Sequence, residues 1–326
     1  MNLHLVIIAI LGLALGLYLV AYVGFGAVLA AALAVGWSGF AILCVYALAL
    51  YLILGPAWSI LLPQPKSLRL WAFVKARMVR DAAADVLPFS QLGGLVLGAR
   101  AAILCGAAAP VAFASLVVDV TTEMLAQIAY IALGLLILRA HLPQTSAVVS
   151  LTNVALFGLA LGVGAGAVFL ALQRYGHRIT GKFIARLLRG SDAAVEAVTE
   201  MFDRIYHART RVALSALLHF VGWIGSAVWA WLAFRLIGAR LDLASVIAIE
   251  GLVCAARSAG SLIPNALGVQ EAAYVVLAPL FGVGAEIGLA VSLLRRARDI
   301  AVGVPVLLIW QVAEGQQALE GRSGRA

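Results

Sequence analysis

Long apolar runs constrain the fold of this chain more than any other sequence feature. A membrane-spanning helix needs about 20 predominantly apolar residues, because the hydrocarbon core of a bilayer is about 30 Å thick. Runs near or above this length occupy residues 3–23, 37–62, 107–138, 148–172, 212–237, 267–292 and 300–318. Only helices and closed barrels satisfy their backbone polar groups in lipid. The sequence therefore predicts an all-α polytopic membrane protein with about seven transmembrane helices.

The composition excludes several other classes of protein. Apolar residues make up 64% of the chain and charged residues 12%, against about 45–50% and about 25% in soluble domains. Soluble enzymes and disordered chains are excluded, and the continuous apolar runs disfavour an outer-membrane barrel. The three cysteines lie far apart and no metal-ligand spacing is present, so we expect no metal site and no cofactor. The net charge of +8 comes without a nucleic-acid-binding motif, so we expect no nucleic-acid partner.

The basic residues indicate how the chain is oriented. Sixteen of the 23 Lys and Arg residues lie in three segments, 63–80, 173–211 and 291–299. Because loops rich in Lys and Arg stay in the cytoplasm, we expect all three segments there. Two spans precede the first segment, which places the N-terminus in the cytoplasm as well.

Two further apolar stretches, 82–106 and 246–266, are interrupted by Pro and Gly. The three basic segments share one side of the membrane only if neither stretch crosses it. We therefore predict that each is a re-entrant hairpin, the first entered from the cytoplasmic side and the second from the outer side.

The two broken stretches also resemble each other. Each has a Pro, a short polar step and then Leu-Gly, and they are about 175 residues apart. Paired interrupted segments in the two halves of a chain are typical of inverted-repeat transporters. We predict one integral membrane domain, 1–326, with half-repeats at about 63–172 and 238–318. The alternative is that such breaks recur by chance in a Gly-rich and Leu-rich chain.

These motifs carry a family resemblance. The segment 87–94 with upstream Arg80, and the segment 264–271, resemble the flippase-like integral membrane family, the transmembrane region of lysylphosphatidylglycerol synthases. Within it, the chain most resembles the hopanoid-biosynthesis-associated membrane proteins. The resemblance implies a lipid transporter that handles hopanoid or another polar lipid across the bacterial inner membrane. Many relatives carry Gly-Glu after the first Pro, whereas Gly94 is followed here by Leu95.

The candidate substrate-binding residues lie in and beside the broken stretches. Ionisable groups at membrane depth are costly and mark functional sites, and guanidinium binds phosphate through two parallel hydrogen bonds. The candidates are Arg80, Pro88, Gly93, Arg100, Arg257, Pro264, Gly268 and Glu271. Three of them have a structural alternative: Arg100 can pair with Asp85, Arg257 with Glu250, and Glu271 can cap a helix.

Three more acidic residues are candidates for proton or cation binding. Asp119 and Glu123 are four residues apart and share one helix face, and Glu250 lies in an apolar segment beside Ile247 and Ile249. Alternatively, Asp119 and Glu123 lie near a helix end, where water or a basic residue compensates them. We expect Arg257, two helical turns further on, to be the partner of Glu250.

The segment 173–211 contains charges three or four residues apart at 178–189, with apolar residues between them. This pattern predicts a basic amphipathic helix on anionic lipid head groups, and it can also dock enzymes of a lipid pathway. Two alternatives to transport therefore remain: a membrane-embedded head-group transferase using Asp119 and Glu123, and a scaffold for lipid-biosynthesis enzymes. No catalytic motif is recognisable, so enzymatic activity stays undecided at this point, with a non-enzyme favoured.

Overall fold

A computed structural model describes most of the chain. The described residues are 30, 33–62, 70–87, 90–141, 146–175, 192–260 and 263–323. The predicted first span at 3–23, the residue Pro88 and the predicted basic helix at 178–189 lie outside them.

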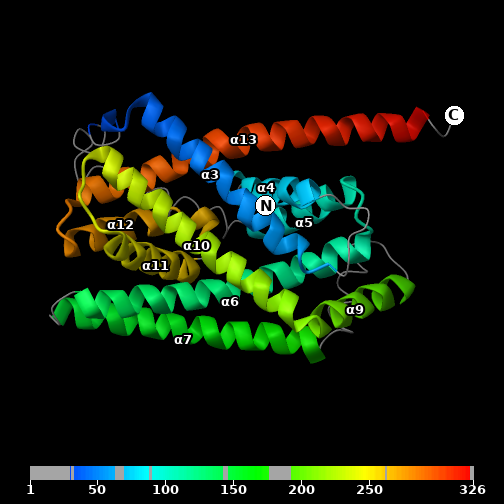
Figure 1. The fold of residues 1–326 in the computed structure, drawn as a ribbon, viewed down its shortest axis with the longest axis horizontal. Helices are drawn as coiled ribbons and strands as arrows, with labels where there is room; N and C mark the ends of the chain where they lie inside the picture. The colour runs from blue at the N-terminus through cyan, green and yellow to red at the C-terminus, as the bar shows by residue number, and fades with distance from the viewer. Residues whose placement is uncertain are drawn as a thin grey trace. The chain divides into compact units, whose positions relative to one another are not determined.

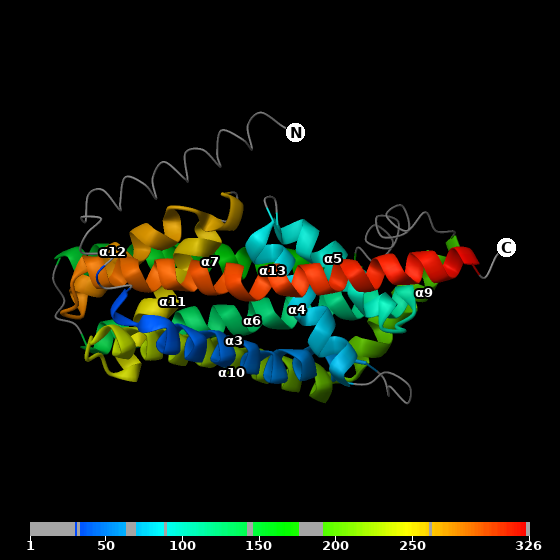
Figure 2. The same ribbon diagram turned by 90° about the horizontal axis from the view of Figure 1, so that it is seen from above.

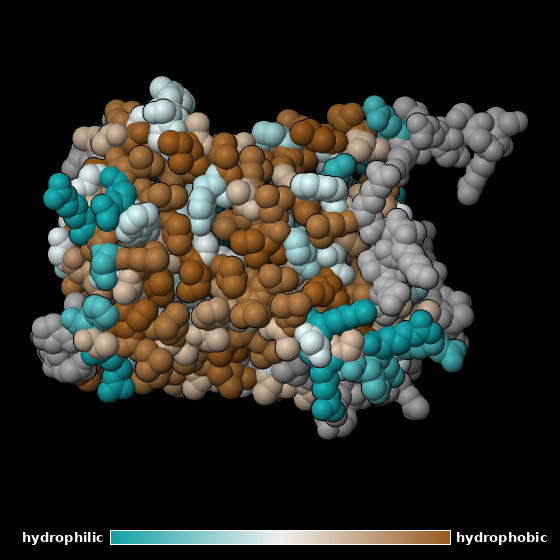
Figure 3. Space-filling view, in the orientation of Figure 1, coloured by the Kyte–Doolittle hydropathy of each residue, from teal (hydrophilic) through white to brown (hydrophobic). Residues whose placement is uncertain are grey.

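Helices account for all the regular structure of the described ranges, which contain no strand. Three helices are long and apolar enough to cross a membrane: α3 (Gly36–Ser59), α6 (Ala109–His141) and α10 (Arg209–Ile237). Large apolar side chains are exposed on them, including Trp37, which is 91% exposed. Figure 3 shows that apolar side chains cover most of the visible face. An all-α membrane protein, as the sequence predicts, is therefore confirmed.

Each broken stretch is part of a longer helical hairpin that precedes a long helix (Figure 1). The first hairpin consists of α4 (Leu70–Val86) and α5 (Ser90–Leu104), which pack against each other before α6. The second consists of α11 (Leu243–Ala259), the short 3₁₀ helix η1 (Pro264–Ala266) and α12 (Val269–Leu280), before α13 (Ala285–Ser323). The two halves of the chain thus share one order of elements, two short helices and then a long one.

The second hairpin turns through left-handed backbone. Asn265, Ala266 and Gly268 have φ values of 49°, 47° and 78°. Such a conformation costs roughly 1–2 kcal/mol at a residue with a side chain, whereas Gly adopts it freely. Contacts from the following helix therefore have to hold this turn in place.

The predicted boundaries are wrong at three places. Segment 63–80 is not a loop throughout, because α4 begins at Leu70. The predicted span 267–292 is two helices, α12 and the start of α13, with a turn at Gly282 (φ 77°) between them. Segment 291–299 is not a connection, because α13 runs through it without interruption (Figure 2). The boundaries differ because several arginines of α4 and α13 are paired with carboxylates inside the protein, which a count of charges along the sequence does not reveal.

The structure divides into two compact units. Unit 1 comprises residues 1–50, 124–168 and 219–298, and unit 2 comprises residues 51–123, 169–218 and 299–326. The helices α3, α6, α10, α13 and α7 (Ser146–Tyr175) therefore contribute segments to both units. Each unit contains one hairpin and has its own buried apolar core.

The core of unit 2 surrounds the first hairpin. Buried side chains of α4 and α5, such as Phe73, Val79 and Ala102, pack with Trp58 and Leu116. A second cluster is formed by α9 (Asp192–His207), which lies inside the segment predicted as a basic loop. Its apolar residues recur at helical spacing and bury one face against α6 and the end of α3; they are Val198, Phe202 and Ile205.

The core of unit 1 surrounds the second hairpin. Ile249, Leu252 and Tyr274 of the hairpin pack with Trp229 and Phe234 of α10. Gly134 and Gly251 face each other so closely that a Cβ on either would lie 3.1 Å from the Cα of the other. This contact brings α6 against α11 at backbone distance.

Candidate functional site

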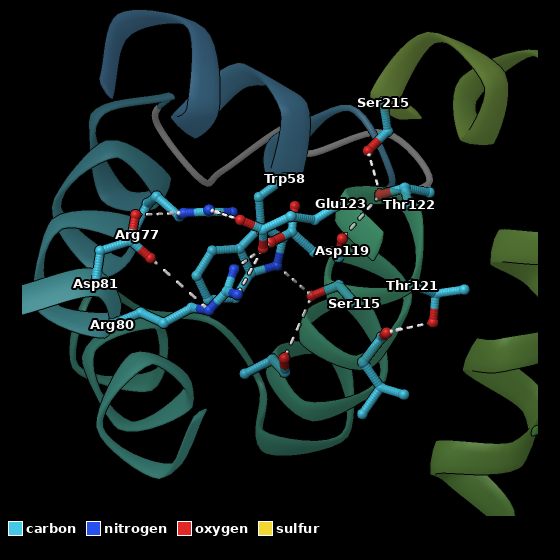
Figure 4. Close-up of polar contacts among 12 residues, drawn as sticks. Trp58, Arg77, Arg80, Asp81, Ser115, Asp119, Thr121, Thr122, Glu123 and Ser215 are labelled. Atoms are coloured by element: carbon cyan, nitrogen blue, oxygen red, sulfur yellow. Dashed lines mark hydrogen bonds and ion pairs between the residues drawn. The ribbon is translucent and has the colours of Figure 1, made fainter. Parts of the chain in front are cut away.

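Each unit contains a buried cluster of arginines and carboxylates at its hairpin. In unit 2 the arginines come from α4 and the acids from α6. Arg77 and Arg80 are three residues apart on α4, and Asp119 and Glu123 are four apart on α6. Each pair therefore lies on one helix face. Figure 4 shows the two guanidinium groups meeting the two carboxylates.

In the unit 2 cluster, each of the two arginines forms hydrogen bonds with both carboxylates of α6. Asp119 Oδ2 accepts hydrogen bonds from Nη1 of Arg77 and of Arg80, both at 3.0 Å. Glu123 Oε1 accepts from Arg77 Nη2 at 2.5 Å, and its Oε2 accepts from Arg80 Nη2 at 2.6 Å. Arg77 Nε also donates to Asp81 Oδ2 at 2.9 Å. Each guanidinium thus holds both α6 carboxylates.

Burial in this cluster decreases from one end to the other. The side chains of Asp119 and Arg77 are 0% and 2% exposed, whereas Arg80 is 12% exposed and Glu123 and Asp81 are each 21% exposed. Of the two α6 carboxylates, Asp119 is therefore fully buried, whereas Glu123 is partly exposed.

Two glycines of α5 fix the position of Arg80. A Cβ at Gly94 would lie 2.7 Å from the Arg80 carbonyl oxygen, and one at Gly98 would lie 2.8 Å from the Arg80 Cβ. Gly94 and Gly98 are four residues apart, which is the spacing that lets helices approach closely. This close approach of α5 holds the backbone of Arg80 beside α6.

In unit 1 the placement of the charges is the reverse of that in unit 2: the hairpin carries the acids and the long helix carries the arginines. The acids Glu250 and Glu271 lie on α11 and α12, and Arg295 and Arg296 lie on α13. Arg295 donates to Glu250 and to the hydroxyl of Tyr274, which itself donates to Glu250. Every one of these five side chains is at most 15% exposed.

The second half of the unit 1 cluster braces the hairpin turn. Arg296 Nε donates to Glu271 Oε1 at 2.6 Å, and both of its Nη groups donate to the Asn265 carbonyl at 3.2 Å. Glu271 Oε2 accepts from the backbone N–H of Gly268 at 2.8 Å. Glu271 therefore caps α12, which is one of the two roles that the sequence left open for it.

The other candidate residues lie apart from these clusters. Arg100 is 52% exposed and pairs with Glu314 at 2.6 Å, not with Asp85 as the sequence suggested. Gly93 lies inside α5, and a Cβ there would meet nothing within 4 Å. Pro264 begins η1.

Arg257 differs from every arginine of the two clusters. Glu250 is held by Arg295, so the predicted Glu250–Arg257 pair is wrong. Arg257 lies in the last turn of α11, is partly exposed, and has no hydrogen-bond or ion-pair partner among the residues that the structure describes. Its neighbour Ser258 accepts a hydrogen bond from Gln127 at 2.8 Å.

Sequence reasoning missed five members of the two clusters, namely Arg77, Asp81, Tyr274, Arg295 and Arg296. A signal for Arg77 was present, because it is three residues from the candidate Arg80 and shares a helix face with it, as Asp119 and Glu123 share a face. Assigning these arginines to a cytoplasmic loop hid that match. Within the described part of the chain, no group of His, Cys, Asp and Glu side chains could hold a metal ion.

These features define an all-helical membrane protein with two helical hairpins, each with buried ion pairs to the following helix. Comparison with known families identifies which one. The chain matches the lysylphosphatidylglycerol synthase transmembrane region over residues 7–306 and belongs to that family. The family resemblance in the sequence is thereby confirmed. No curated protein and no solved structure matches the chain.

Proposed function

We propose that this protein moves or presents a polar membrane lipid, hopanoid or phospholipid, across the bacterial inner membrane. The family is a membrane region of lipid-related proteins, which supports a lipid as the substrate. The observation that carries the proposal is the pair of broken hairpins, each with charged groups held inside an apolar helical unit. Interrupted helices with buried charge are the usual framework of transporter binding sites.

Arg257 is the residue of unit 1 that best fits a lipid head group. Its guanidinium can donate two parallel hydrogen bonds to phosphate. In unit 1 as described, Arg295 and Arg296 already hold carboxylates, whereas Arg257 has no such partner. It also lies in the last turn of α11, seven residues before Pro264. We assign it head-group contact, with the hairpin turn held behind it by Glu271.

The orientation in the proposal follows the basic residues. The N-terminus lies in the cytoplasm and the two hairpins are re-entrant. Within segment 173–211, the basic stretch at 178–189 contacts anionic head groups on the cytoplasmic leaflet and can dock lipid-pathway enzymes. Labelling of single cysteines from each side of the membrane tests this orientation, and periplasmic labelling at position 68 would contradict it.

A head-group transferase is the less favoured alternative. It would need a carboxylate able to take a proton from its substrate. Asp119 and Glu123 each accept hydrogen bonds from two guanidinium groups, so neither carboxylate is free to take a proton from a substrate. The structure thus gives this alternative no specific support.

Lipid translocation by the purified protein tests the proposal. Liposomes containing only this protein and a fluorescent short-chain phospholipid should lose fluorescence from the inner leaflet when an external quencher is present. We expect Arg257→Ala to slow translocation by at least about tenfold, a loss of about 1.4 kcal/mol. Arg204→Ala is the matched control, because Arg204 is 57% exposed and pairs with Glu200 on α9. No translocation by the wild-type protein, or equal rates for both variants, would refute the proposal.

A further inference from the structure

The Glu123 carboxylate lies in unit 2 as a bound anion would lie. Its two oxygens are shared between two guanidinium groups, Oε1 with Arg77 and Oε2 with Arg80. A phosphate diester also offers two terminal oxygens that carry one negative charge between them. Paired guanidinium groups bind carboxylate and phosphate by the same two-oxygen geometry.

We propose that Arg77 and Arg80 form a binding site for the phosphate diester of a lipid, and that Glu123 occupies this site until the lipid displaces it. The inference rests on the proposed lipid function and names the chemical group that unit 2 recognises. Glu123 is an intramolecular competitor, which sets how tightly the site binds phosphate.

The charges in the cluster make this exchange feasible. A phosphate diester carries one negative charge, so replacing one carboxylate leaves the charge around Arg77 and Arg80 unchanged. Asp119 stays in place, because it is 0% exposed and accepts one hydrogen bond from each arginine. Neither arginine is therefore left as an uncompensated buried charge, which would cost far more than the exchange itself.

Partial exposure and the contact of its two oxygens with both arginines together single out Glu123 as the group that can leave. Its side chain is 21% exposed, as is that of the neighbouring Asp81. Glu250 and Glu271 of unit 1 are 6% and 4% exposed, and the protein holds both of them from several sides. The exchange is therefore assigned to unit 2 and not to unit 1.

Glu123→Gln tests the inference directly. The amide keeps the size of the side chain but loses the charge and one acceptor oxygen, so it competes poorly for the two guanidinium groups. If Glu123 occupies the site for about nine-tenths of the time, its removal should tighten the apparent dissociation constant about tenfold. The probe is dioctanoyl phosphatidylglycerol, with binding to the purified protein in detergent micelles measured by thermophoresis.

Several controls separate this site from others. Arg80→Gln together with Glu123→Gln removes one charge of each sign and should abolish the gain. Glu200→Gln on the exposed face of α9 should leave affinity unchanged. Glu123→Asp keeps the charge on a shorter side chain that cannot span both arginines, so it should give an intermediate affinity even if the Gln variant folds poorly. Dioctanoylglycerol, which lacks phosphate, should show no gain.

The outcomes are distinct. A tenfold gain for phosphatidylglycerol that disappears in the double variant supports the inference. Unchanged or weaker binding by folded Glu123→Gln, or a gain that survives in the double variant, would overturn it. A gain for inorganic phosphate but not for the lipid would show that the site takes free phosphate and would overturn the lipid assignment. Translocation by the wild-type protein is measured separately, so the proposed function can stand when this inference fails.

Discussion

Both units contain a buried cluster of arginines and carboxylates, but the elements that carry the two charges are reversed. In unit 2 the hairpin carries the arginines and the following helix carries the acids, whereas in unit 1 the hairpin carries the acids and the following helix the arginines. The acidic side chains of the two clusters also differ in their exposure to the outside. Glu250 and Glu271 are 6% and 4% exposed, against 21% for Glu123. A buried ion cluster can therefore have two roles. It can hold a hairpin in place, or it can contain a carboxylate that a ligand displaces from its arginines.

The physical reason for the difference is how deeply each carboxylate is buried. In unit 1, Glu271 is 4% exposed and is bound by Arg296, by a backbone N–H and by the Ser292 hydroxyl. In unit 2, Arg77 and Arg80 hold Glu123 at the partly exposed end of the cluster (Figure 4). A buried charge with several different donors is expensive to release, and one held at the edge of a unit is less so.

Breaking the closed cluster should have the largest effect on stability. Arg295→Met leaves Glu250 buried without its guanidinium and removes the stacking of Arg295 on Trp229. We expect a loss of about 3–5 kcal/mol in unfolding free energy. Thermal denaturation in detergent measures it, and adding Glu250→Gln should restore part of the loss. A loss below about 1 kcal/mol would mean that this cluster does not brace unit 1.

Neutralising the two α6 acids of the unit 2 cluster should lower the unfolding free energy by different amounts. Asp119→Asn should cost about 3 kcal/mol, because a fully buried carboxylate loses its charge between two guanidinium groups. Glu123→Gln should cost about 1 kcal/mol, because its partly exposed site lets water solvate the arginines. Denaturation of the two variants side by side gives the ratio. Equal costs would remove the distinction between a sealed and an exchangeable carboxylate.

Packing at the first hairpin offers a smaller effect with a control on the same helix. Gly98→Ala places a Cβ 2.8 Å from that of Arg80, and such overpacking costs about 1–3 kcal/mol. Gly93→Ala meets nothing within 4 Å and should stabilise α5 by up to about 1 kcal/mol. Opposite shifts in melting temperature are expected. Shifts of the same sign would show that the close approach of α5 does not position Arg80.

The smallest effect concerns the start of the second hairpin. Asp242 caps α11 by accepting a hydrogen bond from the Ser245 N–H at 3.3 Å. Hydrogen bonds from Ser245 lower the pKa of Asp242. A lowered pKa stabilises the fold above the unfolded pKa of about 3.9, and this stabilisation is lost as the pH falls through the folded pKa.

Asp242→Ala should therefore cost about 1 kcal/mol at neutral pH, and the difference from wild type should shrink below about pH 4. Melting temperatures of both proteins at neutral and acidic pH check this. A difference that grows on acidification would contradict the sign of the linkage. A loss of unfolding free energy as large as that of Arg295→Met would mean that the helix cap stabilises unit 1 as much as the buried cluster does.

Much of the fold could be predicted from the sequence, because it rests on composition and on local backbone chemistry. The apolar runs that became α3, α6 and α10 are visible directly. Pro264 and Gly268 likewise predict a break, since Pro cannot continue a helix and Gly permits the positive φ found there. The capping contact of Glu271 follows from its place in the first turn of α12.

The tertiary structure alone decided which charges meet. From the sequence, the arginines of 63–80 and 291–299 indicated cytoplasmic loops, and Glu250 was matched to Arg257, its neighbour along the helix. In the structure Arg77 and Arg80 meet acids about forty residues away, and Glu250 meets Arg295. Burial raises the energy of an isolated charge so far that a distant opposite charge can outweigh a local tendency toward water. Sequence spacing encodes which residues share a face of one helix, but only the packing of α4 against α6, and of α11 and α12 against α13, brings those faces together.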